Sequence, residues 1–434
     1  MQNSIWSETL SLPSFPSLTG DTKTDVLIIG GGMAGLLCAY QLKQAGVDCL
    51  VIDIGRIGGG VTANTTAKIT SQHGLIYQEL LYKFPRDTVR GYWQANQAAI
   101  AEFSRLAGQF PCDFQVLDNY IYATDSREPL DAELEALYEL GIPAAFAQEL
   151  PLPIQTCGAV IFRDQAQFHP LKFLAGIAGE LNIRERTRAV KIEKGRVTTD
   201  RGLIQAEKII VATHFPIYNR RGLYFMKQYQ DRSYVLALEG AQDVGGMYLD
   251  ASGKGLSFRN QGDALILGGG GHRTGKKTGG WEPLSAFARA CYPGSREVAR
   301  WAAQDCMTLD GMPYIGQYSP GTPWLYVATG FNKWGMTGSM VASMVLRDQL
   351  LDRESSYGQI FDPSRGILWP QLGVNLWESA VNLMTPTRPR CPHLGCALKW
   401  NPREHSWDCP CHGSRFDHEG KLLDAPSVKD LNRE

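Results

Sequence analysis

The run Asp25-Val-Leu-Ile-Ile-Gly-Gly-Gly-Met-Ala-Gly35 is the segment that decides the fold of this 434-residue chain. Its apolar half predicts a buried strand, and the pattern that continues to Gln44 predicts an amphipathic helix directly after the glycines. A second apolar run, Asp48-Cys-Leu-Val-Ile52, follows the helix. Apolar strands on both sides of such a helix are typical of a parallel sheet buried on both faces, so we expect a doubly wound α/β domain.

Three of these glycines, Gly30, Gly32 and Gly35, have the G-x-G-x-x-G spacing of a dinucleotide-binding turn. The first permits the turn, the second lets a pyrophosphate approach the backbone, and the third allows the helix to pack closely on the strand. Glycine-rich turns also serve plain strand-to-helix connections. Asp53 ends the next strand, where a carboxylate can bind ribose hydroxyls, so the context predicts a nucleotide site.

A later segment favours FAD over NAD as the nucleotide. An apolar run over residues 324–330 is followed by Gly330-Phe-Asn-Lys-Trp-Gly-Met-Thr337, where a second helix is expected to begin. The N-terminus of such a helix can stabilise the pyrimidine of a flavin, which is anionic in its reduced form. An ordinary glycine-rich connection is the alternative interpretation.

The order of the predicted elements indicates a discontinuous nucleotide domain. Buried-strand runs at 206–213 and 324–330 return the chain to that domain after segments of mixed α and β character. We therefore expect an α/β protein: an FAD-binding Rossmann-type domain, an inserted α+β substrate domain and a small all-β module at the C-terminus. The expected ranges are 1–85, 151–215 and 305–351 for the FAD-binding domain, 86–150 and 216–304 for the substrate domain, 352–386 for a connector and 387–434 for the C-terminal module.

Charge and composition narrow the set of partners. Lys and Arg total 43 against 44 for Asp and Glu, and the net charge of -1 gives no reason to expect nucleic acid. No apolar run approaches the length of a bilayer, and residues 1–20 have no basic region typical of a signal peptide, so we expect a cytoplasmic protein without a membrane span. A small-molecule substrate is the expected ligand, and the pattern does not specify an oligomeric state.

The C-terminal tail carries a metal-site pattern. It contains Cys391-Pro-His393-Leu-Gly-Cys396 and then Cys409-Pro-Cys411-His412-Gly-Ser414. Cys391, His393, Cys409 and His412 could form a zinc site, but zinc leaves two cysteines without a role and the spacing is not that of a usual finger. A Rieske 2Fe-2S centre accounts for all six residues, since two cysteines hold one iron, two histidines hold the other, and the remaining cysteine pair can bridge the two loops.

Residues 6–351 resemble the D-amino-acid oxidase-like family of FAD-dependent oxidoreductases, most closely those members with a segment like Gly58-Gly-Gly-Val-Thr-Ala-Asn-Thr-Thr-Ala-Lys68. Asp53 stands where a Glu is commoner in the family, and Asp can make the same bond. The resemblance implies a group of FAD contacts along the pyrophosphate and flavin, at the adenine, and at the isoalloxazine ring. The residues implied along the pyrophosphate and flavin are Arg56, Thr62, Thr65 and Thr66. Val190 is implied at the adenine, and the residues implied at the isoalloxazine ring are Gly330, Gly335, Met336 and Thr337.

The tail resembles the Rieske family, including the Gly-Ser pair after the second histidine. The resemblance implies that Cys391, His393, Cys409 and His412 are the cluster ligands and that Cys396 and Cys411 form a disulfide. The supporting β-sandwich of full-length Rieske domains is missing, so we expect the module to depend on the flavin domain for burial. Phe416 stands where high-potential Rieske proteins often have Tyr, which predicts a reduction potential below theirs, to be checked by redox titration.

The sequence also suggests catalytic candidates and several functions. His272 could act as an acid or base, Lys333 could place a positive charge near the flavin, and Asp305 lies in the same region, although His272 and Lys333 are also consistent with solvated positions. We expect the protein to take a hydride from an amine or amino acid derivative on FAD and relay single electrons through the cluster to an external carrier. Alternatives are the reverse electron flow, a redox-responsive or carrier protein without turnover, and an oxidase with a zinc-stabilised tail.

Overall fold

The computed structural model describes residues 3–253, 255–276 and 279–431. In it, the glycine-rich turn connects the first strand of an eight-stranded sheet to the first long helix. Strand β1 (Thr22–Ile29) pairs in parallel with β2 (Cys49–Ile52) on one side and β10 (Leu203–Val211) on the other. The sheet order is β16-β17-β10-β1-β2-β7, and β8 and β9 extend it beside β10. The remaining bounds are β7 Ile183–Arg184, β8 Ala189–Glu193, β9 Arg196–Thr199, β16 Tyr314–Gln317 and β17 Leu325–Thr329.

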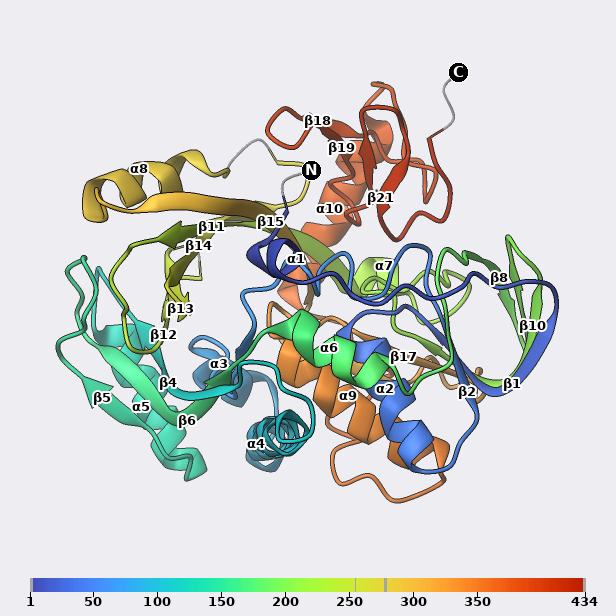
Figure 1. The fold of residues 1–434 in the computed structure, drawn as a ribbon, viewed down its shortest axis with the longest axis horizontal. Coiled ribbons are helices and arrows are strands. Elements are labelled where there is room, and N and C mark those ends of the chain that lie inside the picture. The colour runs from blue at the N-terminus through green and yellow to red at the C-terminus, as the bar shows by residue number, and fades with distance from the viewer. Residues whose placement is uncertain (1–2, 254, 277–278, 432–434) are drawn as a thin grey trace.

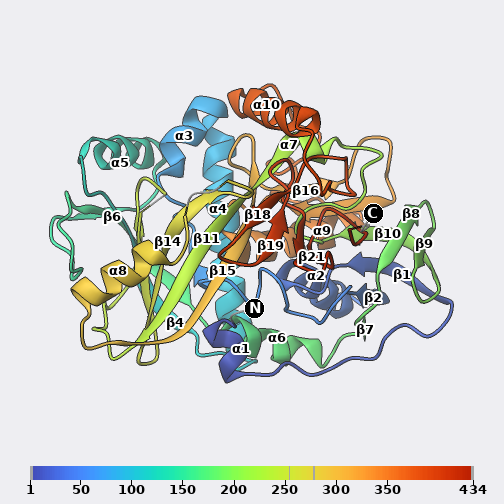
Figure 2. The same cartoon turned by 90° about the horizontal axis from the view of Figure 1, so that it is seen from above.

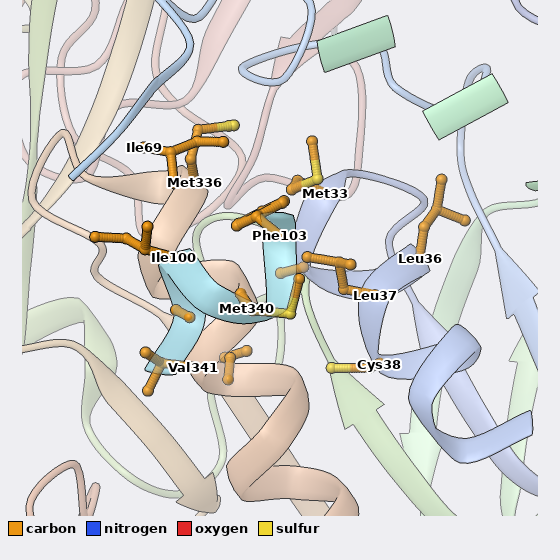
Figure 3. Packing of buried hydrophobic residues seen from close by; sticks show 14 of the residues in the cluster. Met33, Leu36, Leu37, Cys38, Ile69, Ile100, Phe103, Met336, Met340 and Val341 are labelled. Atoms are coloured by element: carbon orange, nitrogen blue, oxygen red, sulfur yellow. The ribbon is translucent and has the colours of Figure 1, made fainter. Parts of the chain in front are cut away.

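Three helices form the main core beside this sheet; the first and third contact its strands, and the second packs against the third. They are α2 (Met33–Gln44), α4 (Arg86–Ala107) and α9 (Gly335–Leu350). Figure 3 shows Leu37, Phe103 and Met340 from these three helices packed against one another, and each is fully buried. Because α2 and α9 both begin at the carboxyl ends of parallel strands, their N-termini lie at the same edge of the sheet, where ligands bind in such folds.

A second, nine-stranded sheet stands beside the first (Figures 1 and 2). Its order is β15-β11-β14-β13-β12-β4-β6-β3, and β5 pairs with β6. The strand bounds are β3 Lys68–Ile69, β4 Gln115–Tyr122, β5 Ala145–Ala147, β6 Ala159–Gln167, β11 Gln228–Glu239, β12 Met247–Asp250, β13 Ser257–Gln261, β14 Ala264–Arg273 and β15 Arg296–Thr308. The shorter helices are α1 Ile5–Thr9, α3 Ile76–Lys83, α5 Glu128–Leu140, α6 Pro170–Ala178, α7 Tyr224–Lys227 and α8 Glu282–Cys291.

The strand pairing bears on the expected domain limits. Strand β6 falls within the expected FAD-binding range 151–215, and β3 within 1–85, yet both strands pair inside the second sheet. The apolar run of β6 resembles that of a strand buried in the first sheet, and the partner of a strand is set by long-range contacts that composition does not reveal. Residues 1–2 and 432–434 of the expected end ranges lie outside the described residues.

The C-terminal module is a four-stranded antiparallel sheet preceded by helix α10 (Pro370–Met384). Its strands are β18 Lys399–Asn401, β19 Ser406–Asp408, β20 Arg415–Asp417 and β21 Leu422–Asp424. Glu404 of the module accepts hydrogen bonds from Arg232 of β11 and from Arg415, and although burial alone would raise its pKa, the two guanidinium groups hold that pKa at about 2. This buried network attaches the module to the second sheet.

The expected fold class is confirmed: an α/β nucleotide-binding fold with an α+β partner and a small all-β module. None of the helices within the described ranges is long and apolar enough to span a bilayer.

Candidate functional site

The turn after β1 is built so that only glycine fits at two of its positions. Gly30 has φ +114°, and a Cβ placed there would lie 2.5 Å from the carbonyl oxygen of Ala212 at the end of β10. A Cβ on Gly35 would overlap the carbonyl oxygen of Gly30. The helix α2 can therefore start directly against the strand, and its N-terminal N–H groups face the edge of the sheet.

Asp53 and Thr62 surround this helix N-terminus. The carboxylate of Asp53 accepts hydrogen bonds from the backbone N–H groups of Gly31 and Gly55, both at 2.7 Å, and burial raises its pKa. The hydroxyl of Thr62 accepts a hydrogen bond of 3.1 Å from the N–H of Met33. These hydrogen bonds fix Asp53 at the end of β2, where its remaining lone pairs can accept from ribose hydroxyls beside the N-terminus of α2, and this arrangement fits a dinucleotide.

One cavity of about 1350 Å³ extends from this turn to the second sheet. It exceeds the usual 300–1,000 Å³ of small-ligand pockets, as expected of a site for a dinucleotide and a substrate together. Nine of the expected cofactor residues line it: Gly30, Gly32, Asp53, Arg56, Thr62, Thr65, Thr66, Gly335 and Met336. The cavity continues from the nucleotide turn to the inserted sheet and leaves room for a substrate, which does not favour the alternative of a carrier protein without turnover.

Four expected cofactor residues do not line the cavity. Gly35 packs against Gly30, and Val190 is 53% exposed, while its neighbour Ala189 lines the cavity. Thr337 donates a hydrogen bond of 3.2 Å to the carbonyl oxygen of Thr70. Gly330 has φ +73°, and a Cβ there would meet the side chains of Thr308 and Gln228.

The loop before α9 is held in an unusual backbone conformation. Asn332 and Lys333 both have positive φ, at 50° and 74°, which costs free energy for residues with a Cβ. The side-chain amide of Asn332 compensates by donating to the carbonyl oxygens of Gly311 and Gly330, each at 2.9 Å. The loop thereby directs Lys333 into the cavity and places the start of α9 at its wall.

Asp305 and Lys333, two of the catalytic candidates, meet in the cavity together with Asp231. Strand register sets Asp231 opposite Asp305, and the Nζ atom of Lys333 lies 3.9 Å from Asp231. Burial raises the pKa of Asp305 to about 6, although Lys333 opposes the rise. A carboxyl group that titrates near neutral pH can accept a proton from a bound cation, and this pair of acids suits an ammonium group.

The third candidate, His272, does not line the cavity. Its Nδ1 lies 2.9 Å from the carbonyl oxygen of Arg273, and its Nε2 lies 3.0 Å from the hydroxyl of Tyr234. Burial lowers the pKa of the imidazole, so the ring is neutral and both of its nitrogens are engaged in the second sheet.

Two cavity residues were not foreseen from the sequence. Lys68 is buried, and its Nζ donates to the carbonyl oxygen of Tyr248 at 2.7 Å and to the hydroxyl of Ser257 at 2.8 Å. Burial, with a contribution from Arg259, lowers its pKa to about 7. His73 stacks on Trp334 at 4.7 Å, and burial lowers its pKa to about 3. The only sequence signal for Lys68 was its place at the end of the threonine-rich segment.

The four expected cluster ligands gather between the two loops of the tail. The thiols of Cys391 and Cys409 lie within hydrogen-bond reach of each other, and the rings of His393 and His412 are 5.0 Å apart. Both nitrogens of His393 and the Nδ1 of His412 are buried without a hydrogen-bond partner. Burial lowers the imidazole pKa values to about 4 and about 3, so both rings are neutral ligands at pH 7. Buried imidazole nitrogens without a hydrogen-bond partner fit the histidine ligands of a Rieske cluster.

The structure has a disulfide between Cys396 and Cys411. The two cysteines come from different loops, so the bond joins the loops around the ligand site. Ser414 lies within hydrogen-bond reach of the Cys391 sulfur, and Phe416 is fully buried in the core of the module.

The cluster loops sit directly on the second sheet. Gln304 of β15 donates a 2.9 Å hydrogen bond from Nε2 to the carbonyl oxygen of Gly413, next to the ligand His412. Gly413 has φ +83°, and a Cβ there would overlap the side chain of Gln230 on β11. The imidazole of His412 in turn bonds the backbone of Phe225, just before β11.

Comparison with known proteins agrees with both sites. The family model described as FAD dependent oxidoreductase matches residues 25–349, and the Rieske [2Fe-2S] domain model matches residues 373–433. The "Putative Rieske 2Fe-2S iron-sulfur protein YhfW" of Bacillus subtilis (strain 168) is 34% identical, over 99% of this chain and 96% of its own length.

Two solved structures share the fold of the larger part. The L-proline dehydrogenase from P. horikoshii aligns with a TM-score of 0.66 and 17% identity, over 81% of this chain and 98% of its own. The glycine oxidase from Geobacillus kaustophilus aligns with a TM-score of 0.66 and 18% identity, over 80% of this chain and 99% of its own.

Proposed function

Since the chain belongs to the FAD-dependent oxidoreductase family and ends in a Rieske [2Fe-2S] domain, we propose that it oxidises a small amine or amino acid derivative and relays the electrons singly through the cluster to an external carrier. FAD supplies a two-electron acceptor for a hydride when it is bound, and the cluster supplies a one-electron carrier. A one-electron carrier has little use in an enzyme that passes its electrons directly to oxygen, so the presence of both sites in one chain favours a relay.

The observation that carries this proposal is that one layer of sheet separates the two sites. Successive side chains of a strand point to opposite faces. On β11, Tyr229 and Asp231 line the flavin cavity, whereas Gln230 contacts Gly413 and Arg232 binds Glu404 of the cluster module. The two sites therefore lie against opposite faces of the same strand, and this closeness supports electron transfer within the chain.

The cavity side chains support an amine as the substrate. Asp231 and Asp305 offer carboxylates to a substrate ammonium group, and Asp305 can accept the proton that the amine must lose before its carbon gives up a hydride. The Nζ atom of Lys333 lies beside them, and Lys68, whose pKa is lowered to about 7, adds an amine that is partly protonated at neutral pH elsewhere in the same cavity. An amino acid would match this combination of charges, since it carries both an ammonium and a carboxylate group.

Anaerobic reduction tests the proposal. Amines and amino acids are mixed with the holoenzyme, flavin bleaching is followed by absorbance, and cluster reduction is followed by EPR of frozen samples. The expected result is flavin reduction followed by a Rieske-type signal. Flavin that is reduced by substrate while the cluster stays oxidised would refute the relay, and flavin reduced only from the cluster would establish the reverse direction of flow.

A matched pair of variants tests the contact between the two sites. Gln304→Leu removes the hydrogen bond to Gly413, whereas Gln44→Leu changes an exposed residue of α2. We expect both variants to keep the wild-type rate of flavin reduction and only Gln304→Leu to reduce its cluster more slowly. Equal cluster rates in the two variants would show that transfer does not depend on this contact.

A further inference from the structure

A segment of the cluster module lines the flavin cavity. Residues 421–425, 427 and 428 are among the cavity-lining residues, although they follow the cluster loops in sequence. They include strand β21 and the turn after it. The Rieske module therefore contributes to two sites, the one that holds the cluster and the one described above for FAD.

The part of the cavity that this segment borders is its nucleotide end. Arg186, Thr187, Arg188 and Ala189 also line the cavity, and backbone hydrogen bonds attach the first two of them to the residues directly after β2. The N–H of Thr187 donates to the carbonyl oxygen of Asp53 at 2.8 Å. Because Asp53 marks the ribose position in this fold, residues 186–189 lie on the adenosine side of the cavity.

Direct contacts join the module to this adenosine side. Arg188 donates from Nη1 to the carbonyl oxygen of Val428 at 3.2 Å, and its Nη2 lies 3.8 Å from the carboxylate of Asp430. From the carboxyl end of β10, His214 faces Asp424, which raises the imidazole pKa against the larger lowering by burial. The segment thus reaches from the end of β10 to the connection between β7 and β8.

The segment is fixed on its other side to the cluster loops. The N–H of Ser427 donates to the hydroxyl of Ser414 at 3.0 Å, within the second ligand loop. Arg415 donates to the carboxylate of Asp424 at 3.1 Å. The wall that faces the nucleotide end is therefore continuous with the loop that carries Cys409 and His412.

The charge of the lining suits a pyrophosphate with its adenosine. Arg56, Arg186, Arg188 and Lys421 all line the cavity, and Arg56, Arg186 and Arg188 come from the flavin domain while Lys421 comes from the module. Positively charged side chains attract a phosphate group most strongly where solvent is partly excluded. We propose that residues 421–428 of the Rieske module form the outer wall of the FAD site and hold the adenosine half of the cofactor in place.

This proposal concerns FAD retention and does not depend on the electron relay or on the substrate. It means that the Rieske module is part of the flavin-binding site, so FAD is held by both ends of the chain. The module would then be needed for FAD affinity even in an assay that requires no electron transfer.

Matched charge reversals test the wall. Lys421→Glu changes a residue that lines the cavity, and Lys429→Glu makes the same change on an exposed residue outside the lining. FAD is titrated into flavin-free protein that retains its cluster, and binding is read from the quenching of flavin fluorescence. We expect Lys421→Glu to raise the FAD dissociation constant about tenfold and Lys429→Glu to leave it unchanged. Wild-type affinity in both variants would overturn the proposal.

Two further measurements guard against a folding artefact. Iron content and melting temperature of each cluster-loaded, flavin-free variant should match the wild type, and Lys421→Gln provides a milder change if Lys421→Glu does not fold. Hydrogen exchange on the unaltered protein gives an independent readout: adding FAD should slow exchange of the amides at 421–425 and leave those of β18 and β19 unchanged. Unchanged exchange at 421–425 would contradict the wall.

Discussion

Replacing Lys68 by Met should flatten the dependence of stability on pH. Lys68 is buried, and no carboxylate lies among its hydrogen-bond partners in the described residues, only the carbonyl oxygen of Tyr248 and the hydroxyl of Ser257. Burial lowers its pKa from 10.5 to about 7. At 1.36 kcal/mol per pKa unit, keeping this amine charged in the folded protein costs about 5 kcal/mol.

The sign of this pH dependence follows from the number of protons that the folded and unfolded states bind. Between pH 7 and pH 10.5 the amine is largely neutral in the folded protein and charged in the unfolded chain, so the unfolded chain binds more protons and stability rises with pH. With these two pKa values, Lys68 alone should add about 3 kcal/mol to the free energy of unfolding between pH 6 and pH 9. The Met variant loses two hydrogen bonds at every pH, and this loss shifts its curve without changing the slope.

The assay is urea unfolding of the FAD-loaded protein at several pH values, followed by fluorescence. The difference between wild type and Lys68→Met should change by about 3 kcal/mol over this range, while Lys23→Met, an exposed lysine of β1, should run parallel to the wild type. Parallel curves for Lys68→Met and wild type would refute the assignment of a buried lysine with a lowered pKa in the cavity.

Three other changes give predictions from the same contacts. Gly30→Ala forces a Cβ toward the carbonyl oxygen of Ala212 at a residue with positive φ, and should therefore yield protein without bound flavin. The loss is measured as missing absorbance in the usual flavin band near 450 nm. Normal flavin content would contradict the steric argument for this turn. Asp305→Asn should remove the rise of kcat/KM through about pH 6 that ionisation of this carboxyl produces, and an unchanged profile would exclude Asp305 as the base. Arg415→Met leaves Glu404 with one buried partner fewer and should cost about 3–5 kcal/mol, measured by denaturation, whereas the more exposed Arg403→Met should cost about 1 kcal/mol or less.

Local chemistry explains why much of the fold could be predicted. The spacing of Gly30, Gly32 and Gly35 reflects backbone angles and close approaches within a few residues, and these leave a direct trace in the sequence. The cluster site is similar, since Cys391 and His393 come from one loop and Cys409 and His412 from the other, and ligand spacing within a loop is set by the metal centre. Both family assignments follow from such short patterns.

The chemical groups that meet in the cavity could not be predicted without the register of strands that are far apart in the sequence. Asp231 and Asp305 are opposite each other only because β11 pairs with β15, and Lys68 reaches Tyr248 through the loop and strand pairing of the second sheet. His272, by contrast, lies in a promising glycine-rich run, but its ring turns toward Tyr234 and away from the cavity. Titratable side chains acquire their function from neighbours that are remote in sequence, so composition alone could not separate these cases.

The sequence by itself determined that the chain has an FAD site and a Rieske site, because glycine turns and ligand loops are specified by residues close together in the chain. Only the tertiary structure decided that one layer of sheet lies between the two sites and that residues 421–428 border the nucleotide end of the cavity. The reason is that docking between domains depends on surface shape and on buried contacts such as Arg232 with Glu404, which join residues 172 positions apart.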